Sequence, residues 1–170
     1  GDITTVGGTA GASGADQGVG GSVTFNSATV LGDGITIDTG ATAGTVTFAS
    51  TLNGTTSVTE TLGITAGTGN VVFAGIVGGG SKELGAVTIT SAGNVTADLA
   101  FTAASLTQTA GAGTTTFTGT VTTTGKAETA GGAVNIAETV GNISFATITT
   151  NGGTSTGIGR AGGAITLHST

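Results

Sequence analysis

The pentapeptide Gly69-Asn-Val-Val-Phe73 sets the pattern that is repeated along this 170-residue chain. It places a glycine first, then a small or polar residue, a β-branched residue, a residue that is polar in most copies, and a large apolar residue. Variants of it lie at residues 21–25, 44–48, 93–97, 113–117, 132–136, 141–145 and 163–167. Because alternate side chains of a strand point to opposite faces, the third and fifth positions face one way and the fourth faces the other. The pattern therefore predicts one short, half-buried strand that recurs along the chain.

The intervals between these units predict a β-solenoid. From Val23 to Val134 the third positions of successive units are 19 to 25 residues apart. Repeats of ~20 to 50 residues are typical of solenoids and arrays. Only 9 residues separate Val134 from Ile143, so one of these two strands is expected to belong to a different face. We therefore predict an all-β fold, a parallel β-helix (β-solenoid) of about seven coils of roughly 19–25 residues each.

Two further features favour stacked coils over a sandwich of antiparallel hairpins. Glycine-rich stretches between the units supply corners that need positive φ or close backbone approach. Stacking also places Phe25, Phe48 and Phe73 in one interior ladder, with Thr24 and Thr47 stacked on the outside. The sandwich is the alternative, since short strands with glycine-rich turns also describe it.

The chain divides into residues 1–20, an irregular Gly-, Ala- and Thr-rich lead-in or first coil, and residues 21–170, the solenoid repeats. Neither end shows an amphipathic helix that would cap the solenoid, and an uncapped solenoid exposes unpaired strand edges. We therefore expect the segment to be part of a longer array or filament. Its expected partner is another solenoid end, in a homopolymer or in neighbouring repeats.

The composition argues against several other partners. The net charge is −6 and only Lys82, Lys126 and Arg160 are basic, which is too few cations to neutralise the phosphates of a nucleic acid. No apolar run approaches the ~18 residues of a transmembrane helix, so no transmembrane segment is expected. Cysteine is absent, which excludes disulfide and thiol chemistry. Lys82 with Glu83, and Lys126 with Glu128, are predicted to form surface pairs in turns.

No cluster typical of catalysis is visible, so the chain is not expected to be an enzyme or to hold a cofactor. Catalytic β-helices need acids grouped with Arg, Lys or His on one face. Here the one histidine is His168, and the acids are scattered along the chain. They are Asp2, Asp16, Asp33, Asp38, Glu60, Glu83, Asp98, Glu128 and Glu138.

Asp33 and Asp38 are weak candidates for a metal site. The stretch Leu31-Gly-Asp-Gly-Ile-Thr-Ile-Asp38 is loosely similar to the Gly-Gly-x-Gly-x-Asp nonapeptide of calcium-binding β-rolls. It occurs once and lacks the leading glycine pair. We favour a corner in which Asp33 makes the turn and Asp38 is solvated, and therefore expect no metal.

Two kinds of polar residue recur in the units. Asn70, Asn94 and Asn142 each follow a glycine at the start of a strand unit, which favours a turn position or an amide ladder over glycosylation of the sequons at Asn94 and Asn142. Threonine pairs with outward hydroxyl groups are expected at residues 45–47, 88–90, 122–124 and 147–149. They suggest ice binding or carbohydrate binding as alternatives, but threonine is also a good strand former.

Three runs of the pattern resemble a known kind of bacterial protein. They are Leu84-Gly-Ala-Val-Thr-Ile-Thr-Ser-Ala-Gly-Asn-Val-Thr96, residues 104–119, and residues 148–153 leading to 162–167. These runs resemble the β-strand repeats of filamentous-haemagglutinin-like adhesins and autotransporter passengers, and the likeness covers about residues 21–167. The resemblance implies a right-handed parallel β-helix that is secreted to the cell surface and serves in adhesion, biofilm or filament building. It carries over no catalytic residue.

These observations together predict a structural segment of an extracellular fibre, filament or stalk, built by end-to-end stacking of solenoids in a secreted bacterial surface protein. The alternative is an adhesin passenger that binds a glycan or another surface ligand. A less favoured one is an ice-binding, threonine-rich solenoid. A ligand-binding segment is expected to carry a non-repeated loop rich in Tyr, Trp or Arg, and this chain contains neither Tyr nor Trp.

Overall fold

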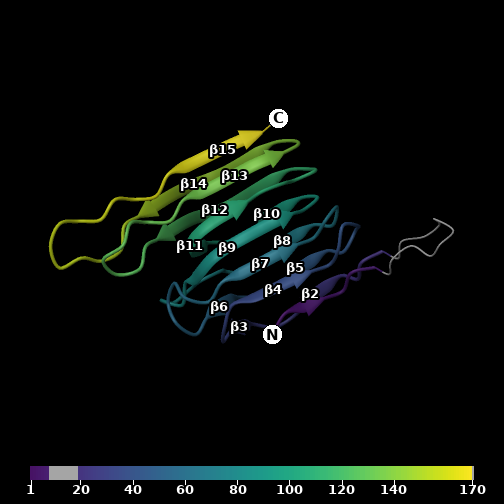
Figure 1. Cartoon of the computed structure of the whole chain (residues 1–170), viewed down its shortest axis with the longest axis horizontal. Helices are drawn as coiled ribbons and strands as arrows, with labels where there is room; N and C mark the ends of the chain where they lie inside the picture. The colour runs from purple at the N-terminus through teal and green to yellow at the C-terminus, as the bar shows by residue number, and fades with distance from the viewer. Residues whose placement is uncertain (8–18, 170) are drawn as a thin grey trace.

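The computed structural model describes residues 1–7 and 19–169, which form β-strands and no helix (Figure 1). The strands are β1 (Ile3–Thr4), β2 (Val23–Phe25), β3 (Thr29–Leu31), β4 (Ile35–Asp38), β5 (Val46–Phe48), β6 (Leu52–Gly54), β7 (Leu62–Thr65), β8 (Val71–Phe73), β9 (Leu84–Ser91), β10 (Val95–Ala97), β11 (Phe101–Gln108), β12 (Thr115–Thr124), β13 (Val134–Thr139), β14 (Ile143–Asn151) and β15 (Ile165–Ser169). All pairs between these strands are parallel. The predicted all-β parallel solenoid is confirmed, and the antiparallel sandwich is wrong. Among the described residues there is no helix long and apolar enough to cross a membrane.

The coils present three faces, here named A, B and C. Face A consists of β2, β5, β8, β10 and the first parts of β12 and β14. Face B consists of β3, β6, an isolated bridge at Val77, and the parts of β11, β12 and β14 around Phe101, Val121 and Ile148. Face C consists of β1, β4, β7, β9, the second part of β11, β13 and β15. Because β11, β12 and β14 each turn a corner without a break, the faces join into one sheet of 13 strands, while β3 and β6 of face B form a separate two-stranded sheet.

The registers define six complete coils, and β1 adds one strand of a further coil on face C. On face A, Val23 begins a column that runs coil by coil to Ile143. Val134 instead pairs with Leu106 on face C, so the prediction that Val134 and Ile143 lie on different faces is confirmed. The units at 132–136 and 163–167 likewise belong to face C, because the pattern encodes a strand with one buried side and not the face on which it lies. Residues 8–18 of the predicted lead-in lie outside the described residues.

The glycine that opens each unit is required by the close stacking of the coils. A Cβ atom on Gly69 would lie 2.3 Å from the carbonyl oxygen of Gly44 in the previous coil. A Cβ atom on Gly93 would lie 2.5 Å from the carbonyl oxygen of Thr68. Both distances are shorter than any real contact, so a larger residue at this corner would push the coils apart.

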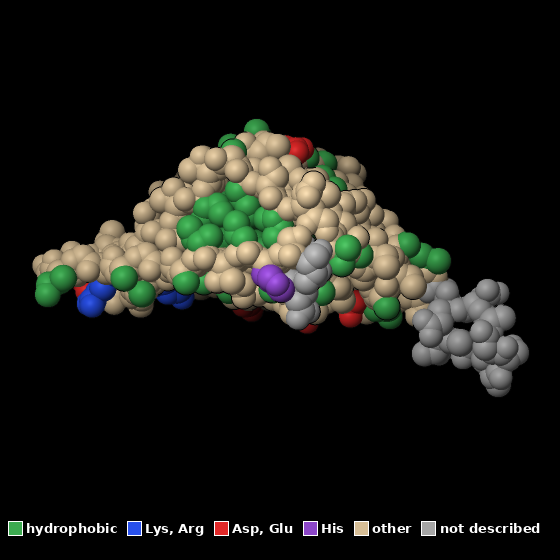
Figure 2. All heavy atoms as spheres, turned by 90° about the horizontal axis from the view of Figure 1, so that it is seen from above, with side chains coloured by type: hydrophobic (Ala, Val, Ile, Leu, Met, Phe, Trp, Pro, Cys, Tyr) green, Lys and Arg blue, Asp and Glu red, His purple; other side chains and the backbone are tan. Residues whose placement is uncertain are grey.

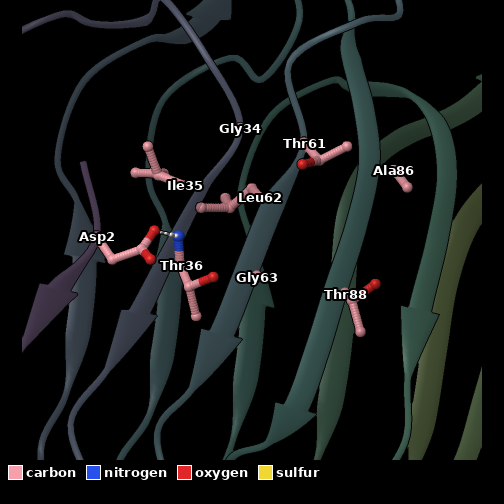
Figure 3. A pocket seen from close by; sticks show the side chains of 9 residues that line it. All are labelled: Asp2, Gly34, Ile35, Thr36, Thr61, Leu62, Gly63, Ala86 and Thr88. Atoms are coloured by element: carbon pink, nitrogen blue, oxygen red, sulfur yellow. Dashed lines mark hydrogen bonds between the residues drawn. The ribbon is translucent and has the colours of Figure 1, made fainter.

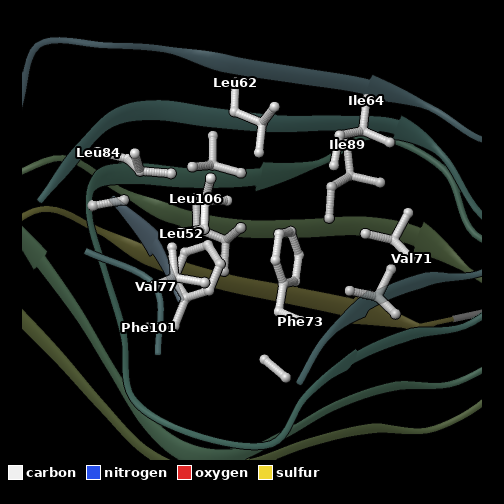
Figure 4. Close-up of a cluster of buried hydrophobic side chains, with 14 of the residues drawn as sticks. Leu52, Leu62, Ile64, Val71, Phe73, Val77, Leu84, Ile89, Phe101 and Leu106 are labelled. Atoms are coloured by element: carbon white, nitrogen blue, oxygen red, sulfur yellow. The ribbon is translucent and has the colours of Figure 1, made fainter. Parts of the chain in front are cut away.

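The core is a column of side chains enclosed by the three faces (Figure 4). Phe25, Phe48 and Phe73 stack face to face, with ring centroids 4.7 and 5.5 Å apart. Thr24 lies opposite Thr47 on the outside of the same strands. The predicted interior ladder and exterior column are therefore confirmed.

In the fourth coil the aromatic column is continued by a phenylalanine of face B and not of face A. Ala97 occupies the position that phenylalanine holds in the neighbouring coils of face A. The fully buried ring of Phe101, from face B, lies edge-on to Phe73 (5.4 Å, 77°) and to Phe117 (5.5 Å, 86°). It fills the volume that alanine leaves, so the aromatic column continues without a gap to Phe145.

Candidate functional site

The last-coil edge, made of β14 and β15, leaves part of the core uncovered. Among the described strands, β14 pairs with β12 and β15 with β13, each on one side only. Ile165 and Leu167 are 48% and 45% exposed, although they stack on the fully buried Val134 and Ile136. Figure 2 looks onto this end and shows an apolar patch in its middle, framed by polar atoms, with the side chain of His168 at its rim.

Three side chains of β14 belong to the same uncovered end. Ile143, Phe145 and Ile148 are only partly buried, whereas Phe117 and Val121, on which Phe145 and Ile148 stack, are almost completely buried. The last-coil edge therefore exposes five apolar side chains that continue the interior columns of the solenoid.

The first-coil edge is open on faces A and B and covered on face C. Among the described strands, β2 pairs only with β5, and β3 only with β6. Val23 and Phe25 of β2 are partly exposed. On face C, β1 pairs with β4 and places Ile3 beside Ile37. The two edges therefore expose residues of the same interior columns, at opposite ends of the solenoid.

The coils at the two edges carry opposite charges. The first coil, residues 19–45, contains Asp33 and Asp38 and no basic residue. Asp2 adds another carboxylate beside β4. Residues 140–169, which form the last coil, contain Arg160 and His168 and no acidic residue.

The corner between faces B and C varies in length from coil to coil. Leu106 follows Phe101 by five positions, whereas Ile165 follows Ile148 by seventeen. The long corners form two pairs of stacked loops, at the left of Figure 1. The first pair comprises residues 55–61 and 78–83, and the second pair comprises residues 125–131 and 152–162. All three basic residues of the chain lie in these loops.

Glu60 is a buried carboxylate that stabilises the loop of residues 55–61 in the first pair. It is 4% exposed, and its carboxylate accepts hydrogen bonds from Thr55 Oγ1 at 2.7 Å and from the Thr56 amide at 3.1 Å. The hydrogen bond from Thr55 lowers the pKa of Glu60 below 4.5; burial opposes this effect and the Thr56 amide adds to it. Lys82 Nζ donates to the Thr55 carbonyl oxygen at 2.6 Å. This contact, rather than the predicted pair with Glu83, anchors the lysine.

Glu128 joins the two loops of the second pair. Its Oε2 atom lies 2.7 Å from Arg160 NH2 and accepts from Ser155 Oγ at 3.1 Å, while Oε1 accepts from the Thr156 amide at 2.9 Å. Arg160 lowers the pKa of Glu128 below 4.5, with a further lowering by the Thr156 amide. Lys126 was the predicted partner of Glu128, but stacking supplies Arg160, which is 32 positions away in the sequence.

Asp33 and Asp38 are the weak metal candidates. Asp33 precedes β4 and Asp38 is its last residue, and each carboxylate accepts a hydrogen bond from a backbone amide in a turn. Asp33 Oδ1 accepts from the Gly34 amide and Asp38 Oδ1 from the Gly40 amide, both at 2.8 Å. Four of the residues between and including them form the extended strand β4, so the two carboxylates belong to opposite ends of this strand. Within residues 1–7 and 19–169, no three His, Asp or Glu side chains gather where they could hold a metal ion.

A polar ladder runs along the corner that precedes face A. The Thr45 amide donates to Ser22 Oγ at 3.1 Å. The amide and Nδ2 of Asn94 donate to Asn70 Oδ1 at 2.9 and 3.1 Å, and the Thr114 amide donates to Asn94 Oδ1 at 2.8 Å. The predicted amide ladder is confirmed for Asn70 and Asn94, but within the described structure it does not extend to Asn142. Sequence reasoning missed the Ser and Thr members, although they follow the unit glycine as the asparagines do.

The outward threonines are distributed over all three faces. Pairs in register are Thr24 and Thr47 on face A, Thr122 and Thr149 on face B, and Thr88 and Thr107 on face C. These columns are interrupted by Val72, Asn53 and Gly63, respectively. Within the described coils, therefore, no face carries a threonine in every coil.

Gly63 leaves a hollow of about 500 Å³ on the outer surface of face C (Figure 3). Thr36 and Thr88 lie on either side of it in the same column. Asp2 forms part of the wall, and its Oδ1 atom accepts a hydrogen bond from the Thr36 amide at 2.8 Å. The hollow thus offers hydroxyl groups and one carboxylate.

Comparisons with protein family models, with curated proteins and with solved structures found no match to this chain. The resemblance to adhesin and autotransporter repeats therefore rests on the sequence pattern alone.

Proposed function

We propose that this protein is a structural segment of an extracellular fibre or stalk in which solenoids stack end to end. The observation that carries the proposal is the last-coil edge, with its five exposed apolar side chains and its unpaired backbone groups. A parallel coil placed on this edge would cover those side chains and pair the free N–H and C=O groups of β14 and β15. The secreted, bacterial setting is inferred from the resemblance of the repeats to surface adhesins.

A second copy of the chain offers the matching surface. β14 begins in the unit Gly141-Asn-Ile-Ser-Phe145 and β2 in Gly21-Ser-Val-Thr-Phe25. In a stack, Ile143 of one copy would therefore extend the column of Val23 in the next, and Phe145 that of Phe25. The contact joins two different edges along the solenoid axis, so it grows a filament and does not close on itself.

The charges of the two edges favour the same head-to-tail order. Two acidic first coils repel each other, whereas the last coil contains no carboxylate that would repel a first coil.

Engineered cysteines test the contact directly, because the chain has none of its own. Thr24→Cys and Ser144→Cys place thiols at outward positions of β2 and β14. In the stack these positions lie on adjacent strands about 4.8 Å apart, within the Cα separation of a disulfide. A mixture of the two single variants should crosslink under mild oxidation, and cryo-electron microscopy should show filaments with layers repeating at ~4.8 Å.

Thr47→Cys is the matched control. Thr47 lies in the same column as Thr24, but Thr24 and Val72 of its own chain flank it on both sides. It should therefore not crosslink to Ser144→Cys. Equal crosslinking of Thr24→Cys and Thr47→Cys, or monomers at every concentration, would overturn the stacking proposal.

An adhesin passenger that binds a glycan is the second candidate, and the polar hollow at Gly63 favours it. In repeat proteins, loops inserted on one side often form a binding surface. The loops of the B/C corner are also inserted on one side of the solenoid. A Cβ atom on Gly63 would lie 3.5 Å from the Thr36 side chain, an ordinary contact, so Gly63→Thr is expected to fill the hollow. Loss of a glycan-array signal in Gly63→Thr, with retention in the open-surface variant Gly32→Ala, would support this function; no signal in the unaltered protein would exclude it.

A further inference from the structure

Strand β1 occupies the place on face C that a stacked neighbour would need. β1 belongs to the layer that precedes the first complete coil and pairs with β4 of that coil. When β14 of a second copy lies against β2 and β3, its last coil fills the same layer on faces A and B. The face C strand of that coil is β15, so β15 would have to lie where β1 now lies.

The intramolecular pairing of β1 is short. It comprises Ile3 opposite Ile37 and Thr4 opposite Asp38, extended by the hydrogen bond of the Thr5 amide to the Asp38 carbonyl oxygen. Just after β1, Thr5 also exchanges two hydrogen bonds with Gly21: its carbonyl oxygen accepts from the Gly21 amide and its Oγ1 atom donates to the Gly21 carbonyl oxygen. The carboxylate of Asp2 accepts a hydrogen bond from the Thr36 amide, as Figure 3 shows. Only Ile3 contributes a large apolar side chain to the column.

β15 is the longer and more apolar strand of the two. Within its own chain it pairs Ile165 with Val134 and Leu167 with Ile136, and the pairing extends to Ser169. The column of Val134 runs through the coils to Ile35, and that of Ile136 runs to Ile37. A neighbouring β15 in the same register would therefore place Ile165 against Ile35 and Leu167 against Ile37, two apolar contacts where β1 makes one.

We infer that β1 is a replaceable cover of the first-coil edge, and that the β15 strand of a second copy of this chain displaces it when solenoids stack. The inference rests on the proposed end-to-end stacking and specifies how face C takes part in it. The exchange forms and breaks only hydrogen bonds and apolar contacts. A strand of two residues opens at low cost, as short edge elements generally do, so β1 slows association without blocking it.

Two cysteine positions on face C distinguish replacement from stacking alone. Thr36 faces outward on β4, and β1 holds Asp2 beside it; Thr166 is the outward residue between Ile165 and Leu167. A disulfide between Thr36→Cys of one copy and Thr166→Cys of another forms only if Thr166 takes the place of Asp2. We expect this crosslink to form together with the face A crosslink between Thr24→Cys and Ser144→Cys.

Weakening β1 should accelerate the exchange. Ile3→Asp removes the apolar contact with the column, and Asp2→Ala removes the hydrogen bond to the Thr36 amide without altering the core. We expect each change to raise the rate of the Thr36–Thr166 crosslink, by about tenfold for Ile3→Asp, which corresponds to 1.4 kcal/mol. Thr4→Ala is the matched control, because Thr4 is exposed and its pairing uses only the backbone; its rate should not change.

The outcomes separate the two proposals. A face A crosslink without a face C crosslink, or a face C crosslink whose rate is unchanged by both Ile3→Asp and Asp2→Ala, would overturn the replacement of β1 and leave the stacking intact. Absence of both crosslinks would overturn the stacking itself, and with it the replacement.

Discussion

The aromatic column shows how single residues hold this solenoid together. Phe73 is completely buried between the rings of Phe48 and Phe101. Phe145 belongs to the same column but has a ring partner, Phe117, on one side and lies at the uncovered end. The same side chain therefore contributes to folding at one end of the column and to a free surface at the other.

Phe73→Ala is expected to lower the free energy of unfolding by about 3–5 kcal/mol, the usual cost of a buried phenylalanine and its cavity. Phe145→Ala should cost roughly half as much in the monomer, because its ring is only partly removed from water. Urea denaturation followed by circular dichroism measures both values. Equal losses for the two variants would contradict the uncovered state of the last coil.

Asn94 has a comparable role among the polar residues. Its Oδ1 atom accepts a hydrogen bond from the Thr114 amide of the next coil, and its backbone amide donates a hydrogen bond to Asn70 Oδ1 of the previous coil. Asn94→Ala should therefore cost about 1 kcal/mol, as expected for a partly buried amide that loses its acceptor. Hydrogen exchange of the Thr114 amide should accelerate, while the buried strands keep their protection; unchanged exchange at Thr114 would refute the ladder.

Among the elements, the paired loops of the B/C corner depend on one carboxylate each. Glu60 binds its own loop, and Glu128 binds the loop of the following coil through Thr156 and Arg160. In both cases the charged form is the one that the hydrogen bonds favour, so the folded pKa lies below 4.5. Each carboxylate therefore contributes stability above the pKa of the unfolded chain, and this contribution is lost as the pH falls through the folded pKa.

Acidification from pH 7 to below pH 4.5 is accordingly expected to loosen the loop of residues 152–162. This loop contains no Asp or Glu of its own and depends on the carboxylate of Glu128. The protection of the Thr156 amide, which is its exchange rate compared with that of an unfolded amide at the same pH, should decrease at the lower pH. Glu128→Gln should show low protection of this amide already at pH 7, and this protection should change little with pH. A variant that stays fully pH-dependent would mean that another group controls the loop.

At the scale of the whole molecule, the described coils place their longest loops at one corner and keep their strands in parallel ladders. All tryptic sites, Lys82, Lys126 and Arg160, lie in the loops of this corner. A cut after Lys126 leaves β12 and β14, which pair over eight positions, on different fragments, and β11 and β13 as well. Backbone pairing between coils, and not chain continuity at this corner, is therefore expected to hold the fold.

Limited trypsin digestion tests this expectation. Fragments cut after Lys82 or Lys126 should separate on a denaturing gel but migrate together under native conditions, with an unchanged circular dichroism spectrum. Lys126→Gln should remove the second cut and leave the first. Dissociation of the nicked protein under native conditions would show that the loop itself carries the stability.

Much of the fold was predictable because it depends on local alternation and on a repeated interval. Alternation along a strand determines which side chain points inward, and a constant interval brings like residues into one column. The Phe25–Phe48–Phe73 ladder, the asparagine ladder and the separate faces of Val134 and Ile143 follow from these two properties. The turn roles of Asp33 and Asp38 follow from the short-range bonding of aspartate next to glycine.

The sequence by itself therefore determined the strands, their buried sides and the parallel stacking of this protein. Only the tertiary structure decided which residues meet between coils: Phe101 in the place left by Ala97, Arg160 at Glu128, and β1 on β4. These contacts join residues about 20 to 35 positions apart, and their register is set by corners of unequal length. Because alternation carries no information about corner length, the sequence indicated uncapped ends but not which side chains the last coil exposes, nor the stacked loops of one corner.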